Sequence, residues 1–209
     1  MPEEVIDFFI KRMSADSKAE RQARRVFEAI PYEFHKLQVP LSKVAHAAVA
    51  KVREYFESDR YMFQFRGARL LRNIFPQSST DFEAELLSVI RKGTETDCEF
   101  VLGVLRNYRG EEFVRTLCKE IVRLIPADSL LRTHVAIALE TTGVVSGEFG
   151  MAEAYERKQG EVRGWLEDPD EKVREFAKWY VQGLEKMSET ERKRAEEEIA
   201  LRKFQYGEE

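Results

Sequence analysis

Proline and glycine are scarce in this sequence. The 209 residues include 6 prolines and 11 glycines, which are too few turn-forming residues for an all-β fold of many short strands. Charged residues make up 34% of the chain, and this content suits exposed helical faces better than sheets. A chain of this length buries roughly 70% of its unfolded surface, so its core needs no disulfide or metal to stabilise it. The composition therefore favours an all-α fold.

Cysteine and histidine are also rare. The two cysteines, Cys98 and Cys118, each lie within an apolar helical pattern, which favours a small buried thiol over a disulfide or a reactive nucleophile. The three histidines are far apart, and none belongs to an H-E-x-x-H motif or to a Cys-pair spacing that would bind zinc. We therefore expect no metal and no cofactor.

Long apolar runs are absent from the sequence. No stretch approaches the roughly 18 apolar residues that are needed to span a bilayer. The first residues also lack the basic segment and the apolar run of a signal peptide. This predicts a cytoplasmic protein without membrane contact.

Catalytic motifs are absent as well. The one glycine-rich stretch, residues 141–150, contains neither the phosphate-binding G-x-x-x-x-G-K-[S/T] pattern nor the G-x-S-x-G nucleophile elbow. We interpret it as a loop between helices, with docking of a partner as the alternative. Because no kinase or dinucleotide signature occurs either, we predict that the protein is not an enzyme. An active site assembled from carboxylates distant in sequence stays open.

Apolar residues recur at helical spacing along most of the chain. The apolar pattern of residues 82–90 is repeated 31 residues later by residues 113–121, and such an offset is typical of helix-pair repeats. The predicted helices are residues 3–13, 17–30, 40–56, 60–75, 81–92, 95–108, 111–125, 128–140, 151–166 with an interruption at 158–160, 169–184 and 188–206.

The clearest predicted helix start lies at Asp168. We expect Asp168 to be the N-cap, and Pro169 to occupy the first helical position, where a missing N–H costs nothing. An apolar stripe follows from Val173 to Leu184 at spacings of three and four residues. Ser188, with a glutamate three residues later, predicts a separate charged helix by the same capping argument.

The order Asp168, Pro169, Val173, Arg174 and Ala177 resembles the turn and second helix of HEAT repeats. In that family an Asp in the turn and an Arg in the helix link neighbouring repeats. The resemblance implies that these five residues have a structural role.

A second, looser unit covers residues 125–136, where the Asp lies four residues before the Arg instead of six. The resemblance implies an all-α, right-handed α-solenoid of degenerate HEAT-like helix pairs with an extended C-terminal helix, and HEAT-like arrays share no catalytic activity. We expect one repeat domain over residues 1–187 and a charged helix or tail over residues 188–209.

Charge is distributed unevenly along the chain. Residues 1–75 hold 14 Lys/Arg and 10 Asp/Glu, whereas residues 76–209 hold 20 and 28. The front part mixes basic and aromatic side chains, which can bind single-stranded nucleic acid by charge and stacking. The alternative is a solvated helix face with Arg stems lying over core aromatics. The candidate partner-binding residues are Lys18, Arg21, Arg25, Arg66, Arg69 and Arg72.

These patterns together predict a non-enzymatic helical-repeat scaffold or adaptor that binds another protein. The closing string from Arg194 to Gly207 also resembles the ends of large multidomain bacterial proteins, which implies a part in a larger bacterial assembly. The charged terminal helix either pairs with another chain or caps the array. Nucleic-acid binding by the basic front half is the alternative function.

Overall fold

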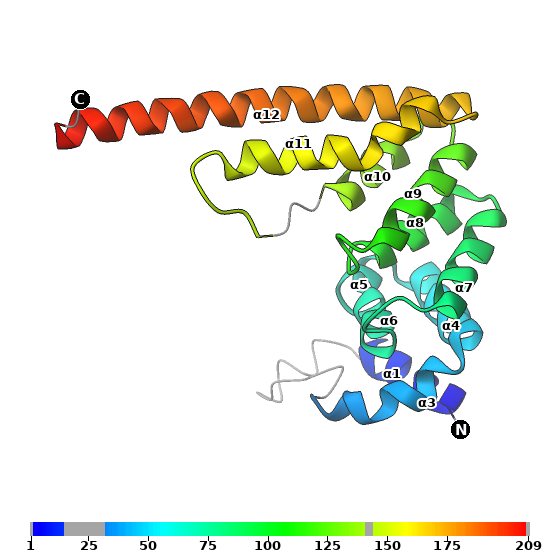
Figure 1. Ribbon diagram of the computed structural model, residues 1–209. Helices are drawn as coiled ribbons and strands as arrows, with labels where there is room; N and C mark the ends of the chain where they lie inside the picture. Colours follow the sequence, from blue (N-terminus) through cyan, green and yellow to red (C-terminus); the bar gives the residue numbers. More distant parts are fainter. Residues whose placement is uncertain (1, 15–31, 141–143, 208–209) are drawn as a thin grey trace. The chain divides into compact units, whose positions relative to one another are not determined.

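The computed structural model describes residues 2–14, 32–140 and 144–207. Every regular element in these ranges is helical and none is a strand (Figure 1), which confirms the all-α prediction. The contacts divide the chain into two compact units, Met1–Leu117 and Cys118–Glu209. Within the described residues, no helix combines the length and the apolar character needed to cross a membrane.

The N-terminal unit consists of short helices (Figure 1). They are α1 Pro2–Ser14, a 3₁₀ helix Tyr32–Leu37, α3 Gln38–Ser42, α4 Ala45–Ser58, α5 Arg60–Met62, a π-helical turn Phe63–Gly67, α6 Ala68–Ile74, α7 Thr80–Arg91 and α8 Glu95–Leu105. Helix α4 packs against α1 and α7, and α8 packs against α6 and α7. Helix α9, Glu112–Leu124, contains the boundary between the two units. The predicted helix 17–30 lies outside the described residues.

Side-chain caps explain where α7 and α8 start. The hydroxyl of Ser79 accepts a hydrogen bond from the amide of Phe82 at 3.4 Å, and that of Thr94 accepts one from the amide of Asp97 at 3.0 Å. Each cap satisfies an amide that has no partner inside its helix. The starts predicted near residues 81 and 95 are therefore confirmed to within one residue.

Phe63 lies at the centre of an aromatic core in the N-terminal unit. Its ring centroid is 5.0 Å from that of Phe56 and 5.3 Å from that of Phe100. Two glycines leave room for this ring: a Cβ at Gly103 would lie 2.6 Å from a Phe63 ring carbon, and a Cβ at Gly67 would lie 2.7 Å from another. The Phe63 ring therefore fits against both Gly67 of its own turn and Gly103 of α8 because neither glycine carries a side chain.

The predicted helix 40–56 is divided in two. Helix α3 ends at Ser42, whose hydroxyl donates to the carbonyl of Val39 at 3.0 Å. Val44 then has the non-helical angles φ −119° and ψ 45° before α4 begins, and Pro40 lies within α3 instead of opening the long helix. The apolar period continues through the break because both segments bury their apolar side chains, so periodicity reports burial here and not an unbroken backbone.

One long helix dominates the C-terminal unit (Figure 1). After the end of α9, the unit contains α10 Leu131–Leu139, α11 Gly150–Val162, a 3₁₀ helix Arg163–Glu167 and α12 Glu171–Tyr206. Helix α12 has 36 residues, which corresponds to about 54 Å, and α11 lies along it. The side chains of the predicted apolar stripe that are buried in α12 are Val173, Phe176, Ala177, Tyr180 and Leu184.

Two predicted breaks in the C-terminal unit are wrong. The Ser188 hydroxyl does not start a new helix, because it donates to the carbonyl of Ala152 at 3.2 Å and hydrogen-bonds Glu156 at 3.0 Å. Helix α12 continues through this position, so the domain boundary predicted after residue 187 falls inside a helix. Helix α11 likewise continues through Gly160, since one glycine costs a helix only about 1 kcal/mol and packing along α12 offsets that cost.

Candidate interaction site

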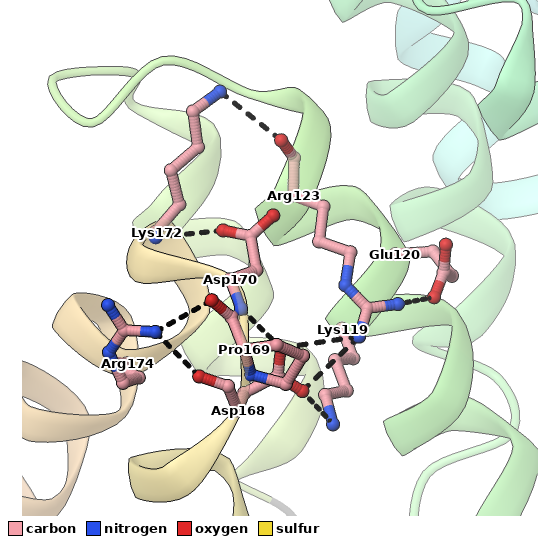
Figure 2. Close-up of polar contacts among 8 residues, drawn as sticks. All are labelled: Lys119, Glu120, Arg123, Asp168, Pro169, Asp170, Lys172 and Arg174. Atoms are coloured by element: carbon pink, nitrogen blue, oxygen red, sulfur yellow. Dashed lines mark hydrogen bonds and ion pairs between the residues drawn. The ribbon is translucent and has the colours of Figure 1, made fainter.

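Asp168 lies just before α12 and is buried, with 5% of its surface exposed. Its carboxylate forms ion pairs with Lys119 and, at 3.2 Å, with Arg123, both from α9, and it accepts the amide hydrogen of Asp170 at 3.0 Å (Figure 2). Burial alone would raise the pKa of this carboxyl, but the hydrogen bonds from Lys119, Asp170 and Arg123 lower it to about 2. Lys172 adds a bond to the Arg123 carbonyl at 3.2 Å. This cluster fixes the start of α12 to the end of α9.

The predicted N-cap of α12 is wrong by two residues. Asp170 caps the helix and accepts the amide hydrogen of Lys172 at 2.8 Å. The carboxylate of Asp168 is occupied by the two cations instead, and Pro169 precedes the first helical residue. Arg174 donates to the carbonyl oxygens of Asp168 and Pro169 at 2.7 and 2.8 Å (Figure 2). Val173 and Ala177 are fully buried, so these five residues form a turn and the first part of α12.

The candidate basic residues do not form one exposed surface in the part of the N-terminal unit that the structure describes. Three of them lie outside the described residues, namely Lys18, Arg21 and Arg25. Arg66 donates to the carbonyl of Met13 at 2.7 Å, and Arg72 forms an ion pair with Glu111 at 2.5 Å. Arg69 is exposed. Because two of the three described arginines bind groups of the protein itself, less of their charge is available to a nucleic acid.

Both cysteines are free thiols in buried positions, as the sequence predicts. Burial raises the pKa of the Cys98 thiol to about 11, with a further contribution from the charge of Asp97, and burial also raises the pKa of the Cys118 thiol. Thiols with raised pKa values contain little thiolate at neutral pH. Neither cysteine is therefore a candidate nucleophile.

A groove runs beside α12 in the C-terminal unit. Its centre is a cavity of about 210 Å³ between α10 and α12. A hollow at the start of α10 shares the lining residue Trp179 with this cavity, and a further hollow beside Tyr155 of α11 shares Met187. The residues of α12 that line these hollows recur at spacings of four, four and three residues, so they lie on one face of the helix. They are Trp179, Gly183, Met187 and Thr190. We call this face, with the three hollows that it lines, the α12 groove.

The α12 groove exposes large apolar side chains. Trp179 is 47% exposed, Met187 is 37% exposed, and Leu130 at the start of α10 is 83% exposed. A Cβ at Gly183 would meet no heavy atom within 4 Å, so this face of the helix is open in the middle. An apolar surface of this kind, rimmed by polar residues, is typical of an interaction site.

Two polar groups line the central cavity of the groove. Burial raises the pKa of the Glu140 carboxyl. The Tyr180 hydroxyl is buried and has no hydrogen-bond partner among the described residues; burial, and then the negative charge of Glu140, raise the pKa of this phenol. Over residues 2–14, 32–140 and 144–207, no three metal-binding side chains are grouped so that they could hold a metal ion. The half-buried carboxylate of Glu140 therefore gives the cavity a polar group between apolar walls.

No family model, curated protein or solved structure matches this chain.

The α12 groove is the feature that the sequence analysis does not predict. Its available signal consists of Trp179, which lies beside the buried stripe of α12, and Gly183, which lies in a helix interior where alanine is about 1 kcal/mol more favourable. A large aromatic residue and an unfavourable glycine one turn apart indicate a helix face with a purpose other than packing in the core.

Proposed function

We propose that this chain is a non-enzymatic helical-repeat scaffold or adaptor that binds another protein in the α12 groove. The observation that carries the proposal is the row of hollows along one face of α12, with the half-exposed ring of Trp179 shared by two of them. Tryptophan is among the residues most enriched at the energetic centres of protein interfaces. The complement of a groove that follows a helix is an amphipathic helix whose anchors are spaced by three and four residues.

The repeat character of the fold is part of this proposal. We interpret the pairs α7–α8 and α11–α12 as degenerate HEAT-like units of a right-handed α-solenoid. In support, the two helices of each pair pack against each other, and the apolar residues that recur at the offset of 31 residues are buried in both α7 and α9. Solenoids bind partners along the surfaces that their successive helices line.

The charge of the C-terminal unit favours a basic partner. Residues 118–209 hold 15 Lys/Arg and 20 Asp/Glu. A net negative field raises the rate at which a positively charged partner finds its site, although it adds less to the final affinity. We therefore expect association to slow as the salt concentration rises.

Affinity capture from the native lysate tests the proposal when three forms of the full chain are compared. They are the wild type, Trp179→Glu in the groove, and Phe204→Glu, which changes an apolar residue of the same helix that is 88% exposed and lies outside the groove. We expect the wild type and Phe204→Glu to retain the same protein in stoichiometric amount, and Trp179→Glu to retain roughly tenfold less.

Thermal melts of all three forms check that the two variants unfold at the same temperature as the wild type. Two results would contradict the proposal: the absence of any stoichiometric partner on the wild type, or equal retention of the partner by Trp179→Glu.

A further inference from the structure

The central cavity of the α12 groove is large enough for an organic ligand. Its volume of about 210 Å³ exceeds the roughly 150 Å³ of an engineered protein cavity that binds benzene. The walls include the side chains of Ala136, Leu184 and Met187, which suit the methylene groups of an aliphatic chain. Since no atom of the described residues lies within 4 Å of a Cβ at Gly183, a chain can enter from this face of the helix.

The polar groups of this cavity lack partners within the described residues. The Tyr180 side chain is 4% exposed, and its oxygen takes part in no hydrogen bond there. Glu140 forms no ion pair with any described residue, and burial alone accounts for the raised pKa of its carboxyl. Glu140 is half-buried, and partial burial without a positive partner disfavours the charged form of a carboxyl group. The Tyr180 oxygen is covered by the protein, so the carboxylate of Glu140 is the group that a ligand with positive charge and hydrogen-bond donors would satisfy.

Trp179 adds an aromatic face at the edge of the same cavity. Its indole lies beside Phe176, with 5.6 Å between ring centroids. The guanidinium of Arg132 lies over Phe176 at 5.7 Å, and no cation of the described residues lies over the indole of Trp179. Tryptophan has the aromatic side chain that attracts a cation most strongly.

We propose that this cavity binds the ammonium end of an aliphatic amine, which is the chemistry of a lysine side chain. The methylene chain packs against Leu184 and Met187 beside the Trp179 indole. The ammonium, with three donors and no acceptor, donates to the carboxylate of Glu140. When the amine is a lysine of a partner protein, this inference rests on the proposed function. Binding of a free amine is independent of the proposed function.

Titration of the full chain with n-pentylammonium chloride tests the inference. The control ligand is 1-pentanol, which has the same chain length and no charge. The chain contains two tryptophans, so two indole N–H signals appear in a ¹⁵N-correlated NMR spectrum, and the Trp165→Phe variant assigns them. We expect pentylammonium to shift the Trp179 signal and to bind roughly tenfold more tightly than 1-pentanol. Equal affinities, or an unmoved Trp179 signal, would overturn the inference.

Three variants separate binding from folding. Glu140→Gln removes the charge and is expected to abolish the preference for pentylammonium, whereas Glu185→Gln, an exposed position of α12, keeps it. Tyr180→Phe removes a covered hydroxyl that has no partner among the described residues, so the variant is expected to be at least as stable in urea and to keep the preference for pentylammonium. A preference for pentylammonium that survives in Glu140→Gln would contradict the assignment.

The source of the amine is decided by two further ligands. One is a helical peptide with a single lysine among leucines, compared with the same peptide carrying norleucine; the other is spermidine. If the lysine peptide binds more tightly than both the norleucine peptide and spermidine, the amine is a lysine of a partner protein. If spermidine binds more tightly than the lysine peptide, the assignment to a partner lysine is overturned. Pentylammonium binding without any captured protein would contradict the proposed function alone. A captured partner without any preference for pentylammonium would contradict this inference alone.

Discussion

Asp168 brings two cations of α9 to one buried carboxylate, so its removal leaves both of them without their shared partner. The side chains of Lys119 and Arg123 are 26% and 33% exposed, and water therefore replaces part of what they lose. The cost is accordingly smaller than for a fully buried ion pair. We expect Asp168→Ala to lower the free energy of unfolding by about 1–3 kcal/mol, measured by urea denaturation.

Asp128 supplies the matched control for this prediction. It is the Asp of the looser repeat unit that the sequence predicts at residues 125–136, but it is exposed. Asp128→Ala should change the free energy of unfolding by less than about 0.5 kcal/mol, as substitutions at open surface positions do. Equal losses in the two variants would show that the buried cluster has no special role.

The lowered pKa of Asp168 predicts a dependence of stability on pH. The carboxyl has a pKa of about 2 in the folded protein against an ordinary value of 3.8. A group whose pKa is depressed by folding contributes its stability fully above the unfolded value and loses it as the pH falls through the folded value. The difference in unfolding free energy between the wild type and Asp168→Asn should therefore be constant above about pH 5 and shrink toward about pH 2.

Urea denaturation at a series of pH values measures this difference, in which the titration of the remaining carboxylates cancels because both forms share them. A difference that stays the same down to the lowest pH would mean that the charge of Asp168 does not stabilise the fold.

At the scale of secondary-structure elements, the contact between α8 and the π-helical turn gives the next prediction. Replacing glycine by alanine inside a helix normally stabilises a protein by up to about 1 kcal/mol. At Gly103 the new methyl group would lie 2.6 Å from the Phe63 ring, which is packed between Phe56 and Phe100 and has little room to move. We expect Gly103→Ala to destabilise the protein by about 1–3 kcal/mol.

Gly160 is the control for Gly103, because it also lies in a helix but a Cβ there would meet no heavy atom within 4 Å. Gly160→Ala should raise the thermal midpoint while Gly103→Ala lowers it. A rise in both variants would show that the aromatic core yields to the added methyl group, and the close approach would then not constrain the fold.

The elements themselves could be predicted where the local sequence decides them. Ser79 and Thr94 precede apolar periods, and the helices start there because a hydroxyl is the best available acceptor for the first amides. Prediction fails where a tertiary partner competes for the same side chain. Asp168 forms ion pairs with Lys119 and Arg123, which lie 49 and 45 residues earlier in the chain. Ser188 donates to a carbonyl of α11, so neither residue caps a helix.

At the scale of the whole molecule, the division into units and the groove could not be read from the sequence. The boundary after Leu117 falls inside α9, where the apolar stripe gives no sign of a change. The groove joins the end of α10 to the middle of α12, and helical periodicity describes each helix without saying which faces meet. The grouping of Asp168, Pro169, Val173, Arg174 and Ala177, by contrast, could be seen in the sequence because these residues lie within one turn and one helix.

The proposed solenoid predicts the size of the molecule in solution. A compact globule of 209 residues has a radius of gyration of about 17 Å. In a solenoid each helix pair contacts only its neighbours, so the mass spreads along an axis, and α12 alone is about 54 Å long by its 36 residues. We therefore expect small-angle X-ray scattering of the monomer to give a radius of gyration clearly above about 17 Å. Light scattering on the same sample fixes the oligomeric state, because a dimer would also enlarge the value. A monomer at or below the compact value would mean that the helix pairs close on themselves as a bundle, and the repeat interpretation would then be wrong.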